Sequence, residues 1–297
     1  MTENSATTPP ARPNAEYEGL RELLAQFEEM GELEHVDGAN WKLEVGAVSE
    51  TVAAANPGRA PAVLFDNIEG YPQGFRILSG AANAVRRLAV VLGLPDPDNE
   101  IDLVCSLRAQ MKKEFKLIPP IEVADGPILE NIDRDDDVNL LKFPAPFVHE
   151  HDGGRYIGTD DLVIMRDPDT GWVNSGTYRV MVHDEKSTGL WMSPGKHGKF
   201  IREKYFDRGE PCPVLISCGH DPMLFITAHQ EIDPGVDELA YAGGLRGRPV
   251  KVIPSEIHGL PMPAHAEIVL EGEMMPGETR EEGPFGEFMG YYASNAS

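Results

Sequence analysis

Residues 162–182 read LVIMRDPDTGWVNSGTYRVMV and carry a strong signal for a β-hairpin. Two apolar runs flank DPDTG at 167–171, and a cluster of Asp, Pro and Gly is typical of a turn between antiparallel strands. We therefore predict strands over 162–166 and 172–182. An Asn and an Arg five positions apart on one strand point to opposite faces unless the strand bends. Gly176 is where it could bend, through a bulge or a close backbone approach.

The strand pattern continues toward the C-terminus. Further strands are predicted at 214–218, 250–253 and 266–270, with short helices near 199–208 and 237–241. Because strands outnumber helices after residue 158, this half of the chain is predicted to form a β-barrel or a β-sandwich.

The first half of the chain has a different pattern. Apolar residues recur at helical spacing from Leu20 to Met30, and Gly31 is a typical stop for such a helix. Short strands at 63–65 and 75–78 and helices at 85–92 and 101–115 complete a small α/β domain. We predict four segments: a disordered tail at 1–15, the α/β domain at 16–118, a wrapping linker at 119–158, and the strand-rich domain at 159–297.

The predicted linker is rich in Pro, Asp and Asn and contains the run DRDDD at 133–137. A calcium-binding loop would need alternating ligand positions and a distal Glu, which this run lacks. We therefore interpret it as a solvated charge run.

Length and charge narrow the classes of function. A chain of 297 residues suggests about two domains. Its net charge of −23 repels phosphate backbones and anionic lipid, so we expect neither nucleic acid nor a membrane as a partner. The N-terminus lacks the apolar core of a signal peptide, and the three cysteines form neither an even disulfide framework nor a CxxC pair. We expect a cytoplasmic protein.

Two segments combine polar groups with glycine. If the strand at 172–179 bends, Asn174 could offer an amide oxygen to a cation and Arg179 a forked donor to a carboxylate or phosphate. An ordinary strand with a solvent-facing arginine is the alternative. In SPGKHGK, residues 193–199, glycines and a proline place His197 at a helix start, which attracts anions. A loop histidine without a role is the alternative there.

Two further segments place carboxylates among apolar residues. In EEGPFGEFMGYY, residues 281–292, Glu282 and Glu287 are separated by a Gly-Pro-Phe-Gly turn. Both could reach one cavity, where one could act as a general acid while the other stays ionised. An acidic surface turn is the alternative, although the aromatic residues in the segment argue against it. Glu238 lies in an otherwise apolar short helix, where it either faces inward, paired or metal-bound, or is solvated.

Together these segments resemble the UbiD family of reversible decarboxylases over most of the chain. The resemblance is most specific in four places, namely the Asn174–Arg179 spacing, the His197 loop, the Glu238 helix that leads into AGGLRG at 242–247, and the turn from Glu282 to Glu287. It implies an α+β fold in which an N-terminal α/β domain is followed by a split β-barrel flavin-binding domain. In the family, a C-terminal α/β domain used in oligomerisation follows.

The resemblance also implies cofactors. The family binds prenylated FMN, made by a separate UbiX-type prenyltransferase, with a divalent ion, usually Mn²⁺, and often K⁺. The divalent-ion ligands match Asn174, His197 and Glu238, a donor set that suits manganese. The cofactor contacts match a larger set: Asn174, Ser175, Gly176, Thr177, Tyr178, Arg179, Lys196, His197 and Glu238.

The implied reaction is the non-oxidative, reversible decarboxylation of an aromatic, heteroaromatic or α,β-unsaturated carboxylic acid. The catalytic set of the family matches Arg179, Glu282 and Glu287. The resemblance makes Glu287 the proton donor, while Arg179 positions the substrate carboxylate and couples to the two glutamates. Which acid is the substrate, and in which direction the reaction runs, stays open.

The family pattern extends beyond the last residue of this chain. We therefore expect that the C-terminal domain is absent, and that the chain is truncated, a fragment or one subunit of a split enzyme. The resemblance implies a homo-oligomer in the full-length form, and a separate C-terminal subunit is a further partner to consider.

Three other functions compete with decarboxylation. A flavin reductase-like oxidoreductase on the same barrel would not need the Arg-Glu-Glu set. A flavin- and metal-binding fragment or subunit would hold the cofactor without independent turnover. A metal hydrolase is disfavoured, because the histidines show no HExxH or comparable pattern.

Overall fold

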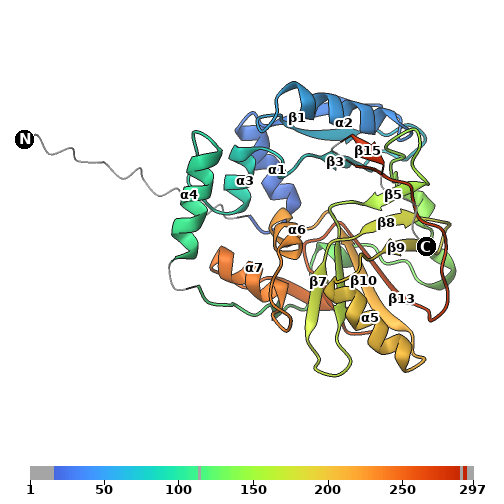
Figure 1. Ribbon diagram of the computed structural model, residues 1–297. Helices are drawn as coiled ribbons and strands as arrows, with labels where there is room; N and C mark the ends of the chain where they lie inside the picture. The colour runs from blue at the N-terminus through green and yellow to red at the C-terminus, as the bar shows by residue number, and fades with distance from the viewer. Residues whose placement is uncertain (1–16, 113–114, 288–289, 293–297) are drawn as a thin grey trace, which may run out of the picture.

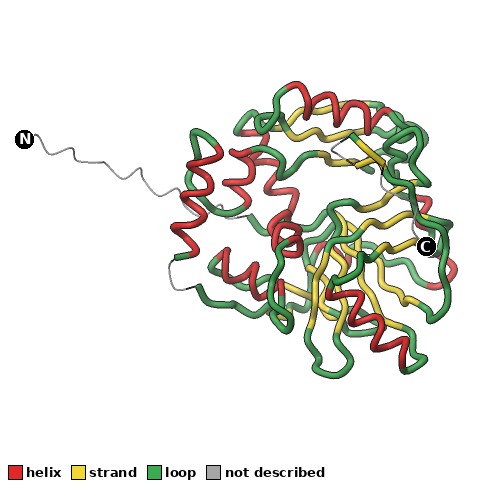
Figure 2. The backbone as a smooth tube through the Cα atoms, viewed as in Figure 1, coloured by secondary structure: helices red, strands yellow, loops and turns green. Residues whose placement is uncertain are grey.

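The computed structural model describes residues 17–112, 115–287 and 290–292. Figure 1 shows a helix-rich N-terminal part beside a strand-rich part, and Figure 2 shows that the strands gather in the second of these. This arrangement confirms the predicted α+β class. The tail predicted at residues 1–15 lies outside the described residues.

The N-terminal part contains a three-stranded sheet with helices packed beside it. Strand β2 is central, and it pairs in parallel with β1 and antiparallel with β3. The elements of this part are α1 (Leu20–Glu29), β1 (Leu33–Asp37), α2 (Glu44–Ala55), β2 (Ala62–Asp66), β3 (Ile77–Ser79), α3 (Val85–Val91) and α4 (Glu100–Met111).

Helix α1 forms because its apolar side chains share one face. The helical spacing predicted this face, and all four of its core residues are buried: Leu20, Leu23, Leu24 and Phe27. Gly31 follows the helix with φ +67°, a left-handed conformation that glycine adopts without strain. The predicted helix and its stop are both confirmed.

The strand-rich part is built on two antiparallel sheets. One has the order β13-β10-β6-β7 and the other β5-β8-β9, and over the described residues they do not close into a barrel. The strands of these sheets are β5 (Arg155–Gly158), β6 (Leu162–Arg166), β7 (Val173–Gly176), β8 (Arg179–Val182), β9 (Thr188–Trp191), β10 (Cys212–Cys218) and β13 (Ile268–Met274).

Helices and smaller sheets surround these two sheets. Strand β11 pairs with β12 and β4, and β14 pairs with β15. The remaining elements are β4 (Ile121–Glu122), α5 (His197–Asp207), α6 (Pro222–His229), α7 (Glu238–Arg246), β11 (Lys251–Pro254), β12 (Pro261–Pro263), β14 (Gly286–Glu287) and β15 (Tyr291–Tyr292), with 3-10 turns at Pro127–Leu129, Asp135–Asp137 and Leu140–Lys142.

The predicted single strand over residues 172–182 is wrong. It is divided into β7 and β8, which lie in different sheets. The chain turns at residues 177–178, where the Tyr178 ring folds back beneath Gly176. A Cβ atom at Gly176 would lie 2.7 Å from that ring, so only glycine fits. The Tyr178 N–H leaves the strand ladder and donates to Asp161 Oδ1 at 3.3 Å.

The segment predicted as a wrapping linker contacts both parts of the chain. Its Phe147 N–H donates to the Trp41 carbonyl at 3.0 Å, and its Leu140 N–H donates to the Glu185 carbonyl at 2.8 Å. The aspartates of the run at 133–137 are exposed, as expected for a solvated charge run. The domain boundaries themselves stay predictions.

One hydrophobic cluster joins the two parts of the chain. It includes Phe27 and Leu64 from the N-terminal part together with Ile164, Leu215 and Leu239 from the strand-rich part. Burial of these apolar side chains in a shared core stabilises the two parts against each other.

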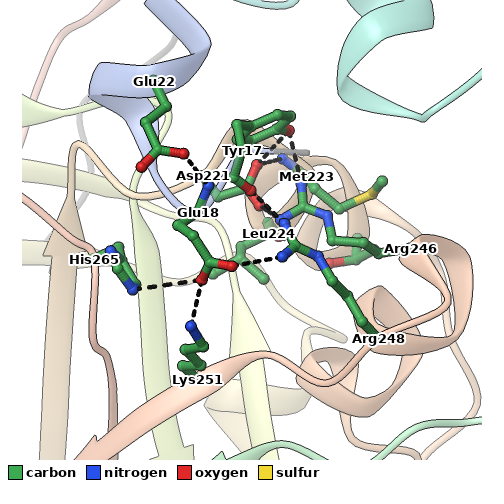
Figure 3. Close-up of polar contacts among 11 residues, drawn as sticks. Tyr17, Glu18, Glu22, Asp221, Met223, Leu224, Arg246, Arg248, Lys251 and His265 are labelled. Atoms are coloured by element: carbon green, nitrogen blue, oxygen red, sulfur yellow. Dashed lines mark hydrogen bonds and ion pairs between the residues drawn. The ribbon is translucent and has the colours of Figure 1, made fainter. Parts of the chain in front are cut away.

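A buried ion-pair cluster also ties the start of α1 to α6 and α7 (Figure 3). Arg246 pairs with Asp221, and Arg246 Nη2 also donates to the Tyr17 hydroxyl at 2.7 Å. The Tyr17 hydroxyl in turn donates to Asp221 Oδ1 at 2.8 Å. We call Tyr17, Asp221 and Arg246 the α1 cluster. The side chains of Asp221 and Arg246 are only 9% and 15% exposed.

His220, between β10 and α6, predicts a pH dependence of stability. Burial lowers the pKa of His220 to about 4 from an ordinary value of 6.5. The unfolded chain therefore binds more protons between these values, and stability falls as the pH drops from about 6.5 to about 4. One pKa unit corresponds to about 1.4 kcal/mol, so this histidine contributes a loss of roughly 3 kcal/mol.

Urea unfolding of the wild type and His220→Gln at several pH values measures this contribution. The variant cannot titrate at this position, so its stability is expected to fall less steeply between pH 6.5 and 4. Equal slopes for the two proteins would contradict the prediction.

Within the described residues, no helix is both long enough and apolar enough to cross a bilayer.

Candidate active site

The three residues expected to be catalytic lie together in the structure. Arg179 Nη2 donates to Glu282 Oε2 at 2.8 Å, and Arg179 Nη1 donates to Glu287 Oε1 at 3.4 Å. The Glu282 side chain is 4% exposed, whereas that of Glu287 is 36% exposed. The guanidinium of Arg179 also lies over the Phe285 ring, 5.3 Å from its centroid. A single arginine therefore holds two carboxylates in different surroundings.

These residues come from elements far apart in the sequence. Arg179 begins β8, Glu282 lies in the chain that follows β13, and Glu287 ends β14. In Figure 1 the red chain after β13 runs back past β9, β8 and β5 to reach β15. This return brings a loop more than a hundred residues away onto Arg179.

A tyrosine that the sequence analysis did not identify completes the contacts of Glu282. The hydroxyl of Tyr156, on β5, donates to Glu282 Oε1 at 2.8 Å. Burial, followed by the neighbouring Glu282, raises the pKa of Tyr156. The phenol therefore keeps its proton and acts as a donor. A buried tyrosine in a strand has no distinctive sequence pattern, so nothing in the sequence marked it.

His183 is a second neighbour of Glu282 that was not anticipated. Its Nε2 is buried without a hydrogen-bond partner among the described residues. A Cβ atom added at Gly189 would lie 2.7 Å from this Nε2 and 3.7 Å from Glu282 Cγ, so the three residues converge. Burial is the main cause that lowers the pKa of His183, and the charge of Arg280 lowers it further.

A large cavity lies beside this set. Its volume is about 2160 Å³, and its wall includes Tyr156, His183 and Glu282 as well as Arg21 of α1 and Ile216 of β10. Pockets that hold a single small ligand typically measure about 300–1,000 Å³, so this cavity has room for more than one.

Asn174 and Glu238 form a second buried polar pair. Asn174 Nδ2 donates to Glu238 Oε1 at 2.9 Å, and the Ser175 N–H donates to Glu238 Oε2 at 2.8 Å. Burial raises the pKa of Glu238 to about 7, against the effect of the hydrogen bond from Ser175. The inward-facing alternative for Glu238 is therefore the correct one. A carboxylate this deeply buried favours a cationic partner.

His197 is the third residue expected to bind the divalent ion. It begins α5, as predicted, and its ring packs edge-on against Trp172 with centroids 5.2 Å apart. No hydrogen bond joins His197 to Asn174 or Glu238 in the described chain, and Lys196 beside it is exposed. Helix α5 is nevertheless anchored to the turn between β7 and β8, because the Gly198 N–H donates to the Tyr178 hydroxyl at 3.2 Å.

The strand carrying these residues also has buried polar atoms without partners. Among the described residues, nine buried side-chain N or O atoms have no hydrogen bond. Four of them belong to the segment from Asn174 to Arg179: Asn174 Oδ1, Ser175 Oγ, Thr177 Oγ1 and Arg179 Nε. Because buried polar groups are nearly always hydrogen-bonded in proteins, this concentration indicates a place for a polar ligand.

The described residues contain no group of three or more His, Cys, Asp or Glu side chains arranged for a metal ion. The expected ligand set also includes Asn174, whose amide oxygen can bind a cation. The unpartnered Asn174 Oδ1 and the buried Glu238 carboxylate fit a cation, while among the described residues no hydrogen bond joins His197 to either of them.

Two family models match the chain. Residues 121–297 match the model of the 3-octaprenyl-4-hydroxybenzoate carboxy-lyase Rift-related domain, UbiD. Residues 24–106 match the model of the N-terminal domain of the same carboxy-lyase, UbiD_N. The chain belongs to the UbiD family.

Curated relatives of this UbiD-family chain include named decarboxylases. It is 38% identical over 256 residues to pyrrole-2-carboxylic acid decarboxylase of Pseudomonas aeruginosa, covering 84% of this chain and 51% of the relative. It is 30% identical over 292 residues to ferulic acid decarboxylase 1 of Saccharomyces cerevisiae, covering 94% and 56%. The UbiD-family chain thus spans about half the length of the curated relatives it matches.

Solved UbiD structures share the fold. The closed form of Sedimentibacter hydroxybenzoicus vanillic acid decarboxylase superposes with a TM-score of 0.87 and 30% identity, over 94% of this chain and 60% of the other. An evolved dimeric form of the UbiD-class enzyme HmfF from Pelotomaculum thermopropionicum, in complex with prFMN, gives 0.83 and 30%, over 94% and 62%.

Proposed function

We propose that this chain forms the prenylated-FMN-binding, catalytic part of a reversible decarboxylase for an aromatic, heteroaromatic or α,β-unsaturated carboxylic acid. One observation carries the proposal: buried polar atoms without partners from Asn174 to Arg179 adjoin the assembled Arg179, Glu282 and Glu287. The named activities of the relatives support the same reaction class. A flavin reductase-like oxidoreductase would not require two glutamates held by one arginine.

The cofactor would be held by residues 174–179, which run from β7 to the start of β8, and by the start of α5. The residues we assign to it are Asn174, Ser175, Gly176, Thr177, Tyr178, Arg179, Lys196, His197 and Glu238. When bound, prenylated FMN supplies an electron sink for loss of carbon dioxide. We assign Mn²⁺ to Asn174, His197 and Glu238, because oxygen and imidazole donors suit manganese. We assign K⁺ to the same part of the cofactor site.

The roles of the three catalytic residues follow from their contacts. Arg179 presents a forked cation to the substrate carboxylate while it holds both glutamates. Glu282 accepts hydrogen bonds at both oxygens, from Arg179 and Tyr156, which hold it beside the arginine. Glu287 has one long bond and greater exposure, so it can gain a proton from solvent and deliver it to the substrate carbon.

The second candidate is a cofactor-binding fragment or subunit without independent turnover. Under either candidate we propose a UbiX-type prenyltransferase as the cofactor source and a cytoplasmic location. We also propose a homo-oligomer in the full-length form, or assembly with a separate C-terminal subunit.

Carbon dioxide release separates these candidates. The chain is loaded with prenylated FMN and Mn²⁺, and cofactor occupancy is verified from the flavin absorbance. It is then mixed with pyrrole, phenolic and cinnamic acids. Release of carbon dioxide from one class supports the decarboxylase. Full occupancy without release contradicts independent turnover and favours the subunit, and NADH-driven flavin reduction would favour the oxidoreductase.

Replacing Glu238 with glutamine is expected to weaken Mn²⁺ binding at least tenfold. Glutamine keeps an oxygen for the Ser175 N–H but removes the charge that faces the cation. Titration with Mn²⁺, followed by the electron paramagnetic resonance signal of the free ion, measures the affinity. Glu231→Gln, at an exposed position, is the matched control. Unchanged affinity in a folded Glu238→Gln protein would exclude this residue as a ligand.

A further inference from the structure

The loop that carries the two glutamates is held by a segment immediately before and within β5. At one end of the loop, Tyr156 donates to Glu282 Oε1 at 2.8 Å. At the other end, the Gly286 N–H donates to Asp152 Oδ1 at 2.8 Å, next to Glu287. We call residues 149–156 the positioning segment, because its contacts flank both glutamates.

The middle of the loop also touches this segment. The Gly153 N–H donates to the Pro284 carbonyl at 2.7 Å. A Cβ atom at Gly153 would lie 2.1 Å from the Gly283 carbonyl oxygen, so the two backbones approach more closely than any other residue allows. Asp152 is itself held, because the His149 N–H donates to its Oδ2 at 2.8 Å. The loop is therefore located by three separate contacts with one segment.

The two glutamates accept different numbers of hydrogen bonds from their surroundings. Both oxygens of Glu282 accept short hydrogen bonds, one from the Tyr156 phenol and one from the Arg179 guanidinium. A proton on Glu282 would displace one of these donors. Glu287 receives only a 3.4 Å contact from Arg179 and is partly exposed. Hydrogen bonds to an ionised carboxylate are stronger than those between neutral groups, so the bond from the Tyr156 phenol strongly restrains the position of the Glu282 side chain.

We propose that Tyr156 is a positioning residue that holds Glu282 against Arg179, so that proton delivery falls to Glu287 alone. The proposal deepens the decarboxylase function proposed above and rests on it. Tyr156 acts through Glu282. The other charged or titratable groups that face Glu282 are Arg179 from β8 and His183 after it, and both are unchanged by the experiment below.

Removal of the phenol hydroxyl tests this proposal without any cofactor. The protein is labelled with ¹³C at the glutamate carboxyl carbon, and the Glu282 resonance is assigned by its loss in Glu282→Gln. In Tyr156→Phe, the Glu282 carboxyl resonance is expected to move at neutral pH, because a charge-assisted hydrogen bond is lost. An unchanged resonance in a folded variant would overturn the proposal.

A matched control makes the same chemical change elsewhere. The Tyr205 hydroxyl donates to the Arg166 carbonyl at 3.1 Å, away from the loop. Tyr205→Phe is therefore expected to leave the Glu282 carboxyl resonance unchanged. If Tyr156→Phe does not fold, all tyrosines can be replaced with 3-fluorotyrosine, whose phenol is a stronger donor. The Glu282 resonance should then move, and no change would contradict the proposal.

Activity provides an independent readout in the loaded enzyme. Tyr156→Phe is expected to lower kcat about tenfold with little change in KM. If the wild type releases no carbon dioxide, the proposed decarboxylase function fails. The carboxyl resonance still decides the role of Tyr156 in that case. If the wild type is active and both readouts are unchanged in Tyr156→Phe, the positioning role alone fails.

Discussion

Glu287→Gln should reduce decarboxylation by about 10²- to 10⁴-fold, the usual contribution of a general acid. Glutamine has nearly the same shape and still accepts a hydrogen bond from Arg179, but it has no carboxyl proton to deliver. Glu282 cannot take over this role, because both of its oxygens are occupied by donors. The loss should therefore appear in kcat, with little change in cofactor or substrate binding.

Single-turnover release of carbon dioxide from the loaded protein measures this effect. Proton transfer is scored separately, by deuterium incorporation into the product. Glu210→Gln, at an exposed position between α5 and β10, is the matched control and should behave like the wild type. Full turnover of Glu287→Gln with bound prenylated FMN would eliminate Glu287 as the proton donor.

Arg246→Ala should lower the free energy of unfolding by about 3–5 kcal/mol, the usual cost of leaving a buried charge without its partner. The change leaves Asp221 of the α1 cluster without its cationic partner and removes a donor from the Tyr17 hydroxyl (Figure 3). Because this cluster connects the start of α1 to α6 and α7, both parts of the molecule are affected.

Urea unfolding followed by circular dichroism measures this loss. Arg280→Ala is the control, because Arg280 pairs with Asp184 at the surface and such pairs contribute about 1 kcal/mol or less. The double variant Asp221→Asn/Arg246→Met should recover part of the lost stability, since neither charge then remains buried. A loss in Arg246→Ala no larger than in Arg280→Ala would contradict the role of the cluster.

Elements with strong local patterns were predicted well from the sequence. The buried face of α1 follows helical spacing, and β6 is a continuous apolar run that ends at a turn. Strand β1 and helix α2 were not anticipated. The β1 side chains are exposed or half-buried, and the strand exists because its backbone pairs in parallel with β2. Helix α2 buries only Val45 and Gly46, so it shows no clear apolar stripe.

The break between β7 and β8 shows how a local pattern can mislead. The apolar run across 172–182 predicts one strand, and Gly176 allowed a bend without requiring one. The bend is imposed by contacts with other elements. The Tyr178 N–H bonds to Asp161, and the Tyr178 hydroxyl accepts from Gly198 of α5.

Local sequence was sufficient to single out the expected catalytic and binding residues, since each glutamate, the histidine and the Asn174–Arg179 spacing lie in recognisable motifs. Motifs do not specify which side chains meet. Glu282 lies more than a hundred residues after Arg179 and Tyr156, which are on different strands. Its hydrogen bonds to them form only when the chain after β13 folds back onto β8 and β5. This packing gives Glu282 two donors and Glu287 one weak contact. The difference between two chemically identical carboxylates is therefore a property of the folded molecule, because hydrogen bonding and burial give them different surroundings.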